Sequence, residues 1–355
     1  MNAIIVSLNF NPGHFSHLIA NYKLFKDCGF SPCLFVNKSF NRMDEKNEFN
    51  KINTLSELKK LKTIDIAVFW FPSLRNIIEI LRLRILFKSK IIYIYHEPFD
   101  AIFDYYKSGF RFKKILKICL IHVVNIQVIL LSHRIVLPSE ASFSLYQKKY
   151  TYLNNNYSLI PLLFDDEADP LLKEYSKKFI SYIGTIAADH AFDRFVDFVD
   201  SAIKNDWFPE YHYLVAVSGI IPIREKKILE PHIKSGKISI SEDHPMTNTE
   251  INNYFRASIL VWNAYNRSMQ SGILPKAYMF GAAVIVLFRN ANEFISDHRT
   301  GVLINNNRDV VEIRKAVEEI IEKKEFYFDN CRKMFLECFY YKNKMGHFLS
   351  LLNIK

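Results

Sequence analysis

The first half of the sequence alternates short apolar runs with longer segments in which apolar residues recur at helical spacing. Runs that are apolar at almost every position, such as 66–71 and 91–95, are typical of parallel strands covered by helices on both faces. The predicted strands are Ala3–Leu8, Pro32–Val36, Ile64–Phe71, Ile91–His96 and Arg134–Pro138. This rhythm predicts a doubly wound α/β domain.

The pattern breaks between Pro161 and Lys178, where acidic residues cluster and no periodicity survives. The group Asp165-Asp166-Glu167-Ala168-Asp169 resembles a DxD-type metal site, but it does not stand at the end of a predicted strand. We therefore interpret it as a solvated linker between two domains.

Strand-like runs return after this linker, again separated by helical segments. They are Phe179–Ile183, Tyr213–Ser218, Lys237–Ile240, Ser258–Trp262 and Ala283–Phe288. One amphipathic helix is clear, because Phe192, Phe195, Val196, Val199 and Ile203 fall on one helical face. The fold class predicted for the chain is α/β, with two Rossmann-like doubly wound domains.

Length and composition fit this interpretation. The chain has 355 residues, more than the roughly 250–300 at which one core stops growing. Apolar residues make up 49% and charged residues 24%, which excludes a disordered chain. The net charge of +10 favours an anionic ligand or surface, and leaves simple polyanion binding open as an alternative.

The cysteines and the apolar stretches indicate a cytoplasmic protein. Five cysteines without a CxxC pair predict neither a disulfide framework nor a metal site. The sequence runs from Met1 directly into a predicted strand, so we expect no export signal. The longest uncharged apolar stretch, Ile118–His133, is shorter than the roughly 20 residues of a spanning helix, so no transmembrane segment is expected.

Two glycine-containing segments of the second half are candidates for ligand binding. Gly184 ends the predicted strand Phe179–Ile183, and ligands of open parallel sheets lie beyond such strand ends. Ser271 is expected to cap a helix that begins near Gly272, which would present free amides to a phosphate, with Lys276 one turn further on. The alternatives are an ordinary tight turn at Gly184 and a capped surface helix with a solvated lysine.

These residues carry a resemblance to a known family. The glycine after the first strand of the second domain is followed by Ser-Gly-x-Leu-x-x-Ala-x-x-x-Gly-x-x-Val-Ile-Val from Ser271 and by Thr300-Gly301-Val302-Leu303-Ile304. This pattern resembles the GT-B glycosyltransferases of family 4. The resemblance implies a retaining hexosyltransferase with a nucleotide-sugar co-substrate and no metal or other cofactor. It also implies a donor site mainly in the C-terminal domain, within an interdomain cleft.

The sequence departs from the family at its Glu-x7-Glu signature, where Ser268 and Lys276 stand in place of the two acids. The Arg and Lys that the family places on the diphosphate are replaced by Thr185 and His190. We expect Lys276, or Arg267 or Arg289, to supply the missing charge. The predicted donor-binding residues are Gly184, Thr185, His190, Ser268, Gln270, Ser271, Gly272, Ile273, Lys276 and Glu293, the last of which matches a family acid or serves a structural role.

In the first domain, Gly13 and His14 occupy the loop where the family contacts donor phosphate and acceptor. The spacing of His14 and His17 alone does not predict zinc, because no third ligand accompanies them. His96 and Glu97 end a buried strand and are the predicted catalytic residues, since the family carries a functional histidine there. We expect His96 to position substrate and stabilise charge, or alternatively to be a strand-end histidine bonded to backbone.

A basic cluster with aromatic residues precedes the apolar run that begins at Ile118. It contains Lys107, Arg111, Lys113, Lys114 and Lys117 among Tyr105, Tyr106, Phe110 and Phe112. This mixture favours peripheral docking on an anionic membrane, and the alternative is a core helix with solvated first turns. Nucleic acid is not expected as a partner, because no binding motif accompanies the charge.

We therefore expect an acceptor-binding domain over residues 1–165, a donor-binding domain over 171–335 and a C-terminal helix over 336–355 that packs on the first domain. The expected reaction transfers a sugar to a lipid-linked glycan in bacterial surface polysaccharide synthesis, such as lipopolysaccharide O-antigen or capsule, at the inner face of the plasma membrane. The absent glutamates favour an alternative, a catalytically silent GT-B protein that binds nucleotide or glycan beside a partner enzyme.

Overall fold

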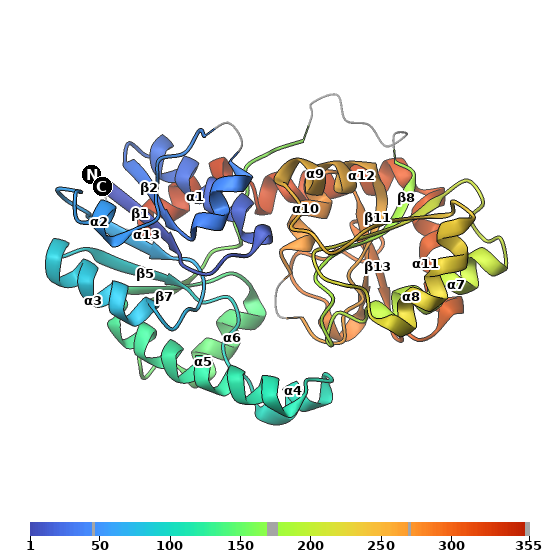
Figure 1. Ribbon diagram of the computed structural model, residues 1–355, viewed down its shortest axis with the longest axis horizontal. Helices are drawn as coiled ribbons and strands as arrows, with labels where there is room; N and C mark the ends of the chain where they lie inside the picture. Colours follow the sequence, from blue (N-terminus) through green and yellow to red (C-terminus); the bar gives the residue numbers. More distant parts are fainter. Residues whose placement is uncertain (45–46, 169–176, 269–270, 352–355) are drawn as a thin grey trace. The chain divides into compact units, whose positions relative to one another are not determined.

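The computed structural model describes residues 1–44, 47–168, 177–268 and 271–351. The chain divides into two compact units (Figure 1). We call Met1–Asp165 with Phe339–Lys355 the N-terminal lobe, and Asp166–Cys338 the C-terminal lobe. The sequence-based domain boundaries, 1–165, 171–335 and 336–355, lie within a few residues of these divisions.

The N-terminal lobe is built around a parallel sheet of order β3-β2-β1-β4-β5-β6-β7. Its strands are β1 (Asn2–Ser7), β2 (Ser31–Val36), β3 (Lys51–Ile52), β4 (Ile66–Phe69), β5 (Lys90–Ile94), β6 (Arg134–Leu137) and β7 (Tyr157–Leu159). Its helices are η1 (Pro12–His14), α1 (Phe15–Asp27), η2 (Lys38–Met43), α2 (Leu55–Leu58), α3 (Asn76–Phe87), α4 (Ile102–Lys107), α5 (Phe112–Leu131), α6 (Glu140–Lys149), η5 (Tyr341–Lys344) and α13 (Met345–Leu351).

Two helical layers cover this sheet. α1 and α13 lie on one face, and α3, α5 and α6 lie on the other (Figure 1). The carboxyl end of the chain joins this lobe through the backbone pairing of Phe164 with residues 339–341 and through a 2.8 Å hydrogen bond from the Tyr341 hydroxyl to Asp27.

The C-terminal lobe repeats the plan with a parallel sheet of order β10-β9-β8-β11-β12-β13. Its strands are β8 (Phe179–Gly184), β9 (His212–Val217), β10 (Ile238–Ser241), β11 (Ser258–Trp262), β12 (Ala283–Leu287) and β13 (Gly301–Ile304). Its helices are α7 (Phe192–Lys204), α8 (Ile223–Lys234), α9 (Asn248–Ala257), α10 (Ile273–Met279), η4 (Phe288–Asn290), α11 (Val310–Glu322) and α12 (Lys324–Cys338).

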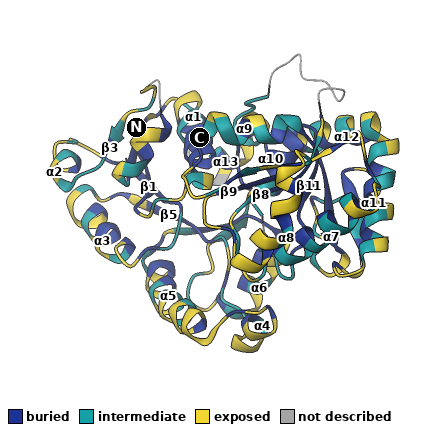
Figure 2. Ribbon diagram, turned by 45° about the vertical axis from the view of Figure 1, so that its right-hand side comes forward, coloured by how far each residue is buried: buried dark blue, intermediate teal, exposed yellow. Residues whose placement is uncertain are grey.

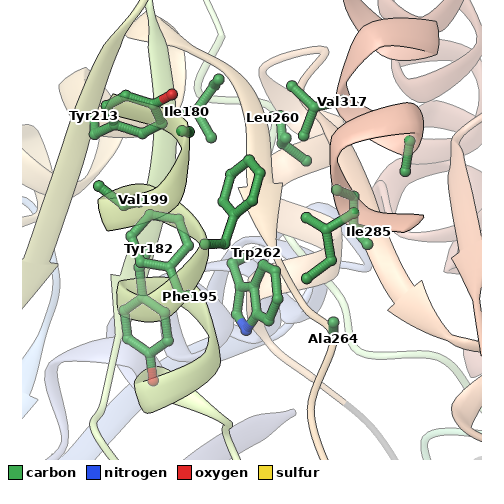
Figure 3. Packing of buried hydrophobic residues seen from close by; sticks show 14 of the residues in the cluster. Ile180, Tyr182, Phe195, Val199, Tyr213, Leu260, Trp262, Ala264, Ile285 and Val317 are labelled. Atoms are coloured by element: carbon green, nitrogen blue, oxygen red, sulfur yellow. The ribbon is translucent and has the colours of Figure 1, made fainter. Parts of the chain in front are cut away.

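The core of this lobe lies between its sheet and the layer of α7, α8 and α11. Phe195 and Val199 of α7 pack against the strand residues Tyr182, Tyr213 and Trp262 (Figure 3). α9, α10 and α12 cover the opposite face (Figure 1). The predicted α/β class and the amphipathic helix at Phe192 are therefore confirmed.

Candidate active site

The end of β8 lies against the start of α10 in the C-terminal lobe. Gly184 closes β8 with a φ of +128°, which side chains other than glycine rarely adopt. A Cβ added to Gly184 would lie 3.2 Å from Cδ1 of Ile273, the first residue of α10. The fold thus brings together the two glycine-containing segments that the sequence singled out, although they lie almost ninety residues apart.

The first turn of α10 differs in detail from the expected capping. Gly272, in place of Ser271, is the N-cap residue, and its backbone is already helical. The Ser271 Oγ accepts a 3.3 Å hydrogen bond from the amide of Ile273, and its side chain is also bonded to Tyr265. The expectation that Ser271 is the N-cap is therefore wrong, but Ser271 does order the start of the helix.

His190 and Thr185 share this strand edge. The His190 ring stacks on Tyr265 with 4.3 Å between centroids and 10° between planes. Its Nδ1 lies 2.7 Å from the Thr185 carbonyl oxygen, which can only accept, so Nδ1 carries the hydrogen in the neutral tautomer. Burial raises the pKa of Tyr265, which stays a neutral hydroxyl group.

Lys276 lies inside the lobe and is 6% exposed. Its ammonium donates to Glu167 Oε1 at 2.9 Å and to Asn252 Oδ1 at 2.6 Å. Burial opposes ionisation of Glu167, but Lys276 and the amides of Asn252 and Asn248 outweigh burial, and the pKa of this carboxyl lies below its usual range. Because this ion pair already neutralises Lys276, the geometry argues against its expected contact with a diphosphate.

The acidic residues expected in a solvated linker are held by specific cations. Asp166 forms a two-pronged ion pair with Arg332, at 2.8 and 3.1 Å, and Glu167 pairs with Lys276. In the N-terminal lobe, Asp165 pairs with Lys23. The solvated-linker interpretation is therefore wrong for Asp165, Asp166 and Glu167, whereas Asp169 lies outside the described residues.

The other predicted donor residues have simpler surroundings. Ser268 is partly exposed, Glu293 is exposed in a turn after η4, and Gln270 lies outside the described residues. Arg289 is exposed in η4, which follows β12 at the same edge of the sheet as Gly184. Of the three cations that the sequence suggested, Lys276 is paired internally, Arg267 is half-buried and Arg289 is exposed at this edge.

Sequence analysis missed Asn263 and Tyr265, which follow β11, the strand between β8 and β12. Asn263 is buried, and its side-chain Oδ1 has no hydrogen-bond partner among the described residues. The rule that polar residues after parallel strands gather at one edge would have found both.

In the N-terminal lobe, aromatic and imidazole rings gather beyond β1, β4 and β5. His14 in η1 packs on Phe71, with 4.4 Å between centroids, and stacks on His96 at 6.5 Å. Burial and the neighbouring His96 lower the pKa of His14 to about 3, so this ring is neutral at physiological pH. Its Nδ1 is buried and has no hydrogen-bond partner among the described residues.

His96 is bonded to backbone, as the alternative interpretation held. Its Nε2 lies 2.8 Å from the Trp70 carbonyl oxygen, which places the hydrogen on Nε2 and makes Nδ1 the acceptor in the neutral ring. The ring is partly exposed, so this bond orients it without enclosing it, and the adjacent Glu97 is exposed. A backbone-bonded His96 is thus compatible with the positioning role that the sequence predicted.

The remaining residues of this loop have local roles. Gly13 has an ordinary backbone conformation, and its amide donates to Asn11 Oδ1 at 3.0 Å. His17 is buried against Trp70 and Phe164. Within the described parts of the chain, no three His, Cys, Asp or Glu side chains are grouped so as to hold a metal ion.

Comparison with solved structures shows that both lobes together match known folds over nearly their full length. The chain is similar to sucrose-phosphate synthase from Thermosynechococcus elongatus, with a TM-score of 0.72 at 10% identity over 99% of this chain and 98% of that one. It is similar to HepE of Anabaena in complex with UDP, with a TM-score of 0.67 at 11% identity over 99% and 100%.

TarM of S. aureus, in a complex with fondaparinux, alpha-GlcNAc-glycerol and UDP, gives a TM-score of 0.69 at 10% identity over 99% and 100%. No protein-family model and no curated protein matches the sequence. The two parallel sheets with their flanking helices and these similarities together show the GT-B fold of two Rossmann-like lobes.

Proposed function

We propose that this chain is a glycosyltransferase of the hexosyltransferase class that takes its sugar from a nucleoside-diphosphate sugar. Its fold is that of glycosyltransferases, and HepE, one of the similar proteins, has been solved with UDP-glucose and with UDP and glucose. Because fold alone does not determine activity, the proposal depends on the strand edge of the C-terminal lobe.

One observation carries the proposal, namely the close approach of Gly184 to Ile273 at the carboxyl edge of a parallel sheet. Because Gly184 has no Cβ, the Ile273 side chain can pack against the end of β8, which brings the first amides of α10 to this edge of the sheet, where we propose that they bind a phosphate. Thr185, His190 and Ser271 line the same edge with polar groups, and Arg289 supplies a cation. In this proposal Lys276 supports α10 from inside the lobe.

We infer a retaining reaction without metal, as the resemblance to family 4 implies. The bond between the anomeric carbon and the diphosphate oxygen breaks, and the acceptor hydroxyl bonds to that carbon on the same face. The proton of this hydroxyl passes to the departing diphosphate. His96, oriented by the Trp70 carbonyl, positions the substrate and stabilises charge in this step.

We further propose that the acceptor is a lipid-linked glycan of bacterial surface polysaccharide synthesis, such as O-antigen or capsule. The protein would then work from the cytoplasm, bound peripherally to the inner face of the plasma membrane. The basic and apolar segment around Lys107 and Phe112 supports this location.

A thermal-shift screen of purified protein with UDP-, GDP-, ADP- and CMP-sugars tests the donor. A rise of several degrees with sugars of one nucleotide is expected, since a ligand that binds only the folded state raises its stability. A transfer assay with this donor, with and without a chelator, then tests turnover and metal dependence. NMR of the product's anomeric proton tests retention. A flat response to all four nucleotides contradicts the proposal.

The second candidate is a silent GT-B protein, which the replacement of both signature glutamates by Ser268 and Lys276 favours. It predicts a thermal shift with one nucleotide but neither transfer nor donor hydrolysis across a broad panel of donors and acceptors. Turnover by purified protein with any of these donors eliminates it.

A further inference from the structure

The outer layer of α3, α4 and α5 exposes an unusual amount of apolar surface. Among the described residues, 13 of the 21 exposed large hydrophobic side chains lie in or directly before these three helices. Figure 2 shows exposed stretches along α3, α4 and α5. We call this set the apolar helix face. It consists of Leu74, Ile78, Leu81, Ile85, Leu86, Ile102, Phe103, Tyr106, Phe112, Leu116, Leu120, Val123 and Leu130.

α5 contributes the longest stripe of this face. Its exposed apolar residues begin with Phe112, which is 79% exposed, and recur at positions 116, 120, 123 and 130, so they share one side of the helix. The opposite side buries Ile115, Val128 and Ile129 in the lobe. A helix of 20 residues is about 30 Å long. α5 thus has apolar residues on both its buried and its exposed side, and its lysines lie in its first two turns.

α3 and α4 extend the stripe into a surface. α3 packs beside α5, and its exposed residues Ile78, Leu81 and Ile85 follow the same helical spacing from Leu74. α4 packs against α5 and exposes Ile102, Phe103 and Tyr106. Apolar patches of this kind on a globular lobe mark a binding surface.

The part of the chain that contains α3, α4 and α5 also carries most of the net charge. Residues 66–139 contain eleven Lys and Arg but four Asp and Glu, which gives +7 of the +10 of the whole chain. No acidic residue lies between Asp104 and Glu140. Lys107, Arg111, Lys113, Lys114 and Lys117 are all exposed, and the Lys107 ammonium lies over the Phe103 ring at 4.4 Å.

We propose that the apolar helix face docks on an anionic phospholipid bilayer, with α3, α4 and α5 lying in the plane of the membrane surface. Apolar side chains would enter the boundary of the acyl chains, and the lysines and arginines around them would contact lipid phosphates. This inference rests on the proposed function in one respect, since it names the surface that would carry a lipid-linked acceptor.

Two other occupants fit the observations less well. α5 is the one helix of the described chain long and apolar enough to span a membrane. However, it packs on α3, α4 and β5, and Asn125 of α5 accepts a 2.9 Å hydrogen bond from the Tyr93 hydroxyl inside the lobe. A spanning α5 would lose this packing. In a symmetric dimer the same basic patch would face its own copy, and like charges would repel.

Vesicle co-sedimentation of the full-length protein tests the proposal. We expect binding to vesicles of phosphatidylcholine mixed with phosphatidylglycerol, weak binding to phosphatidylcholine alone, and release by high salt. Equal binding to both vesicles, or none to either, overturns the proposal. Protein released from vesicles by detergent but not by salt also overturns it, because a spanning helix behaves in this way.

Two double variants separate the contributions of charge and apolar contact. Lys113→Glu with Lys117→Glu, and Leu116→Ser with Leu120→Ser, should each weaken binding to the anionic vesicles by about tenfold or more. Matched changes at exposed helix positions of the C-terminal lobe serve as controls, namely Lys227→Glu with Lys315→Glu and Ile223→Ser with Val311→Ser. The control variants should bind vesicles as the parent protein does.

Thermal melts establish that each variant is folded. Unchanged vesicle binding in both test variants, or equal losses in the controls, overturns the proposal. The proposal is also overturned if the protein does not bind vesicles but forms a dimer in sedimentation analysis, and if this dimer dissociates in the variant with Leu116→Ser and Leu120→Ser. The assay contains neither nucleotide nor acceptor, so a chain without transferase activity still gives a result, and a failure here leaves the donor screen unaffected.

Discussion

The carboxyl edges of the two sheets differ sharply although the sheets share one topology. In each lobe the first five strands lie in the order third, second, first, fourth, fifth. The N-terminal edge is filled by rings, those of His14, Trp70, Phe71 and His96. The C-terminal edge is formed around a glycine, with backbone groups and short polar side chains at Gly184, Thr185 and Ser271.

The two edges indicate that strand order determines the position of a site, whereas the loop residues determine what the site binds. An edge filled by partly buried rings offers shape and a neutral imidazole, which suits a sugar or its acceptor. An edge where a glycine lets a helix start pack against a strand end suits a phosphate. Substitutions in both lobes test whether the two edges are as different as their residues indicate.

The largest loss of stability is expected when a buried acidic residue of the C-terminal lobe loses its cation. Lys276→Met leaves the Glu167 carboxylate without its cation and should lower the free energy of unfolding by about 3–5 kcal/mol. Lys23→Met, which removes the 37% exposed partner of Asp165 in the N-terminal lobe, should lower it by about 1 kcal/mol or less. Urea denaturation of both variants measures the difference.

The double variant Lys276→Met with Glu167→Met controls for the unpaired charge and should recover much of this loss. Equal effects of Lys276→Met and Lys23→Met would contradict the buried ion pair. Because Lys276 is paired inside the lobe, a folded Lys276→Ala protein should keep its donor dissociation constant, and a much larger constant would return Lys276 to the donor site.

A matched pair of alanine substitutions tests the glycine near the carboxyl end of the first strand in each lobe. Gly184→Ala forces a side chain into a backbone with φ of +128° and should cost about 1–3 kcal/mol, together with weaker donor binding. Gly13→Ala places its Cβ at 3.4 Å from Asn11 Oδ1 in an ordinary conformation and should change stability by about 0.5 kcal/mol or less. Thermal melts with and without nucleotide test both variants. Similar losses of stability in the two variants would contradict the difference expected between the two glycines.

The two partly exposed histidines should affect different kinetic constants. His96→Ala, at the ring-filled edge, should lower kcat by about tenfold with little change in the KM for donor, because it acts on the reacting groups. His190→Ala, at the glycine-containing edge, should mainly raise this KM, since its ring lines the proposed donor site. Steady-state kinetics with varied donor distinguish them, and full turnover by His96→Ala would dismiss its role.

The last prediction concerns the response of the protein's stability to acid. The pKa of His14 is about 3 in the folded protein and about 6.5 in the unfolded chain. Between these values the unfolded state binds the extra proton, so stability is full above about pH 6.5 and falls as the pH drops toward 3. His14→Phe should reduce this fall. Urea midpoints near pH 7 and near pH 5 measure it, and an unchanged slope would contradict a buried, neutral His14.

Much of the fold was predictable because most of its strands are buried apolar runs. All ten predicted strands are found, whereas β3, β7 and β13 were not predicted. β3 has two residues and β7 has three, and such short edge strands leave no periodicity to recognise. The strand order in each lobe is one of the doubly wound orders, and the apolar pattern alone did not predict which one.

The site was predictable only in part. The rule that ligands lie beyond strand ends located Gly184, His190 and His96 correctly at their edges. It did not predict that Lys276 would turn inward to Glu167, because the two residues are 109 positions apart and sequence spacing contains no sign of such a contact. The apolar helix face was hidden for a related reason, since an exposed apolar stripe and a buried one have the same spacing.

The return of residues 339–351 to the N-terminal lobe has a consequence for biosynthesis. Phe164 pairs with backbone that the ribosome adds more than 170 residues later, and Phe348 packs on Phe25, 5.4 Å between centroids. While the C-terminal lobe is synthesised and folds, the N-terminal lobe lacks the segment that follows Cys338. Synthesis of the segment after Cys338 therefore completes the lobe that was begun first, and a premature stop after Cys338 would leave this lobe without that segment.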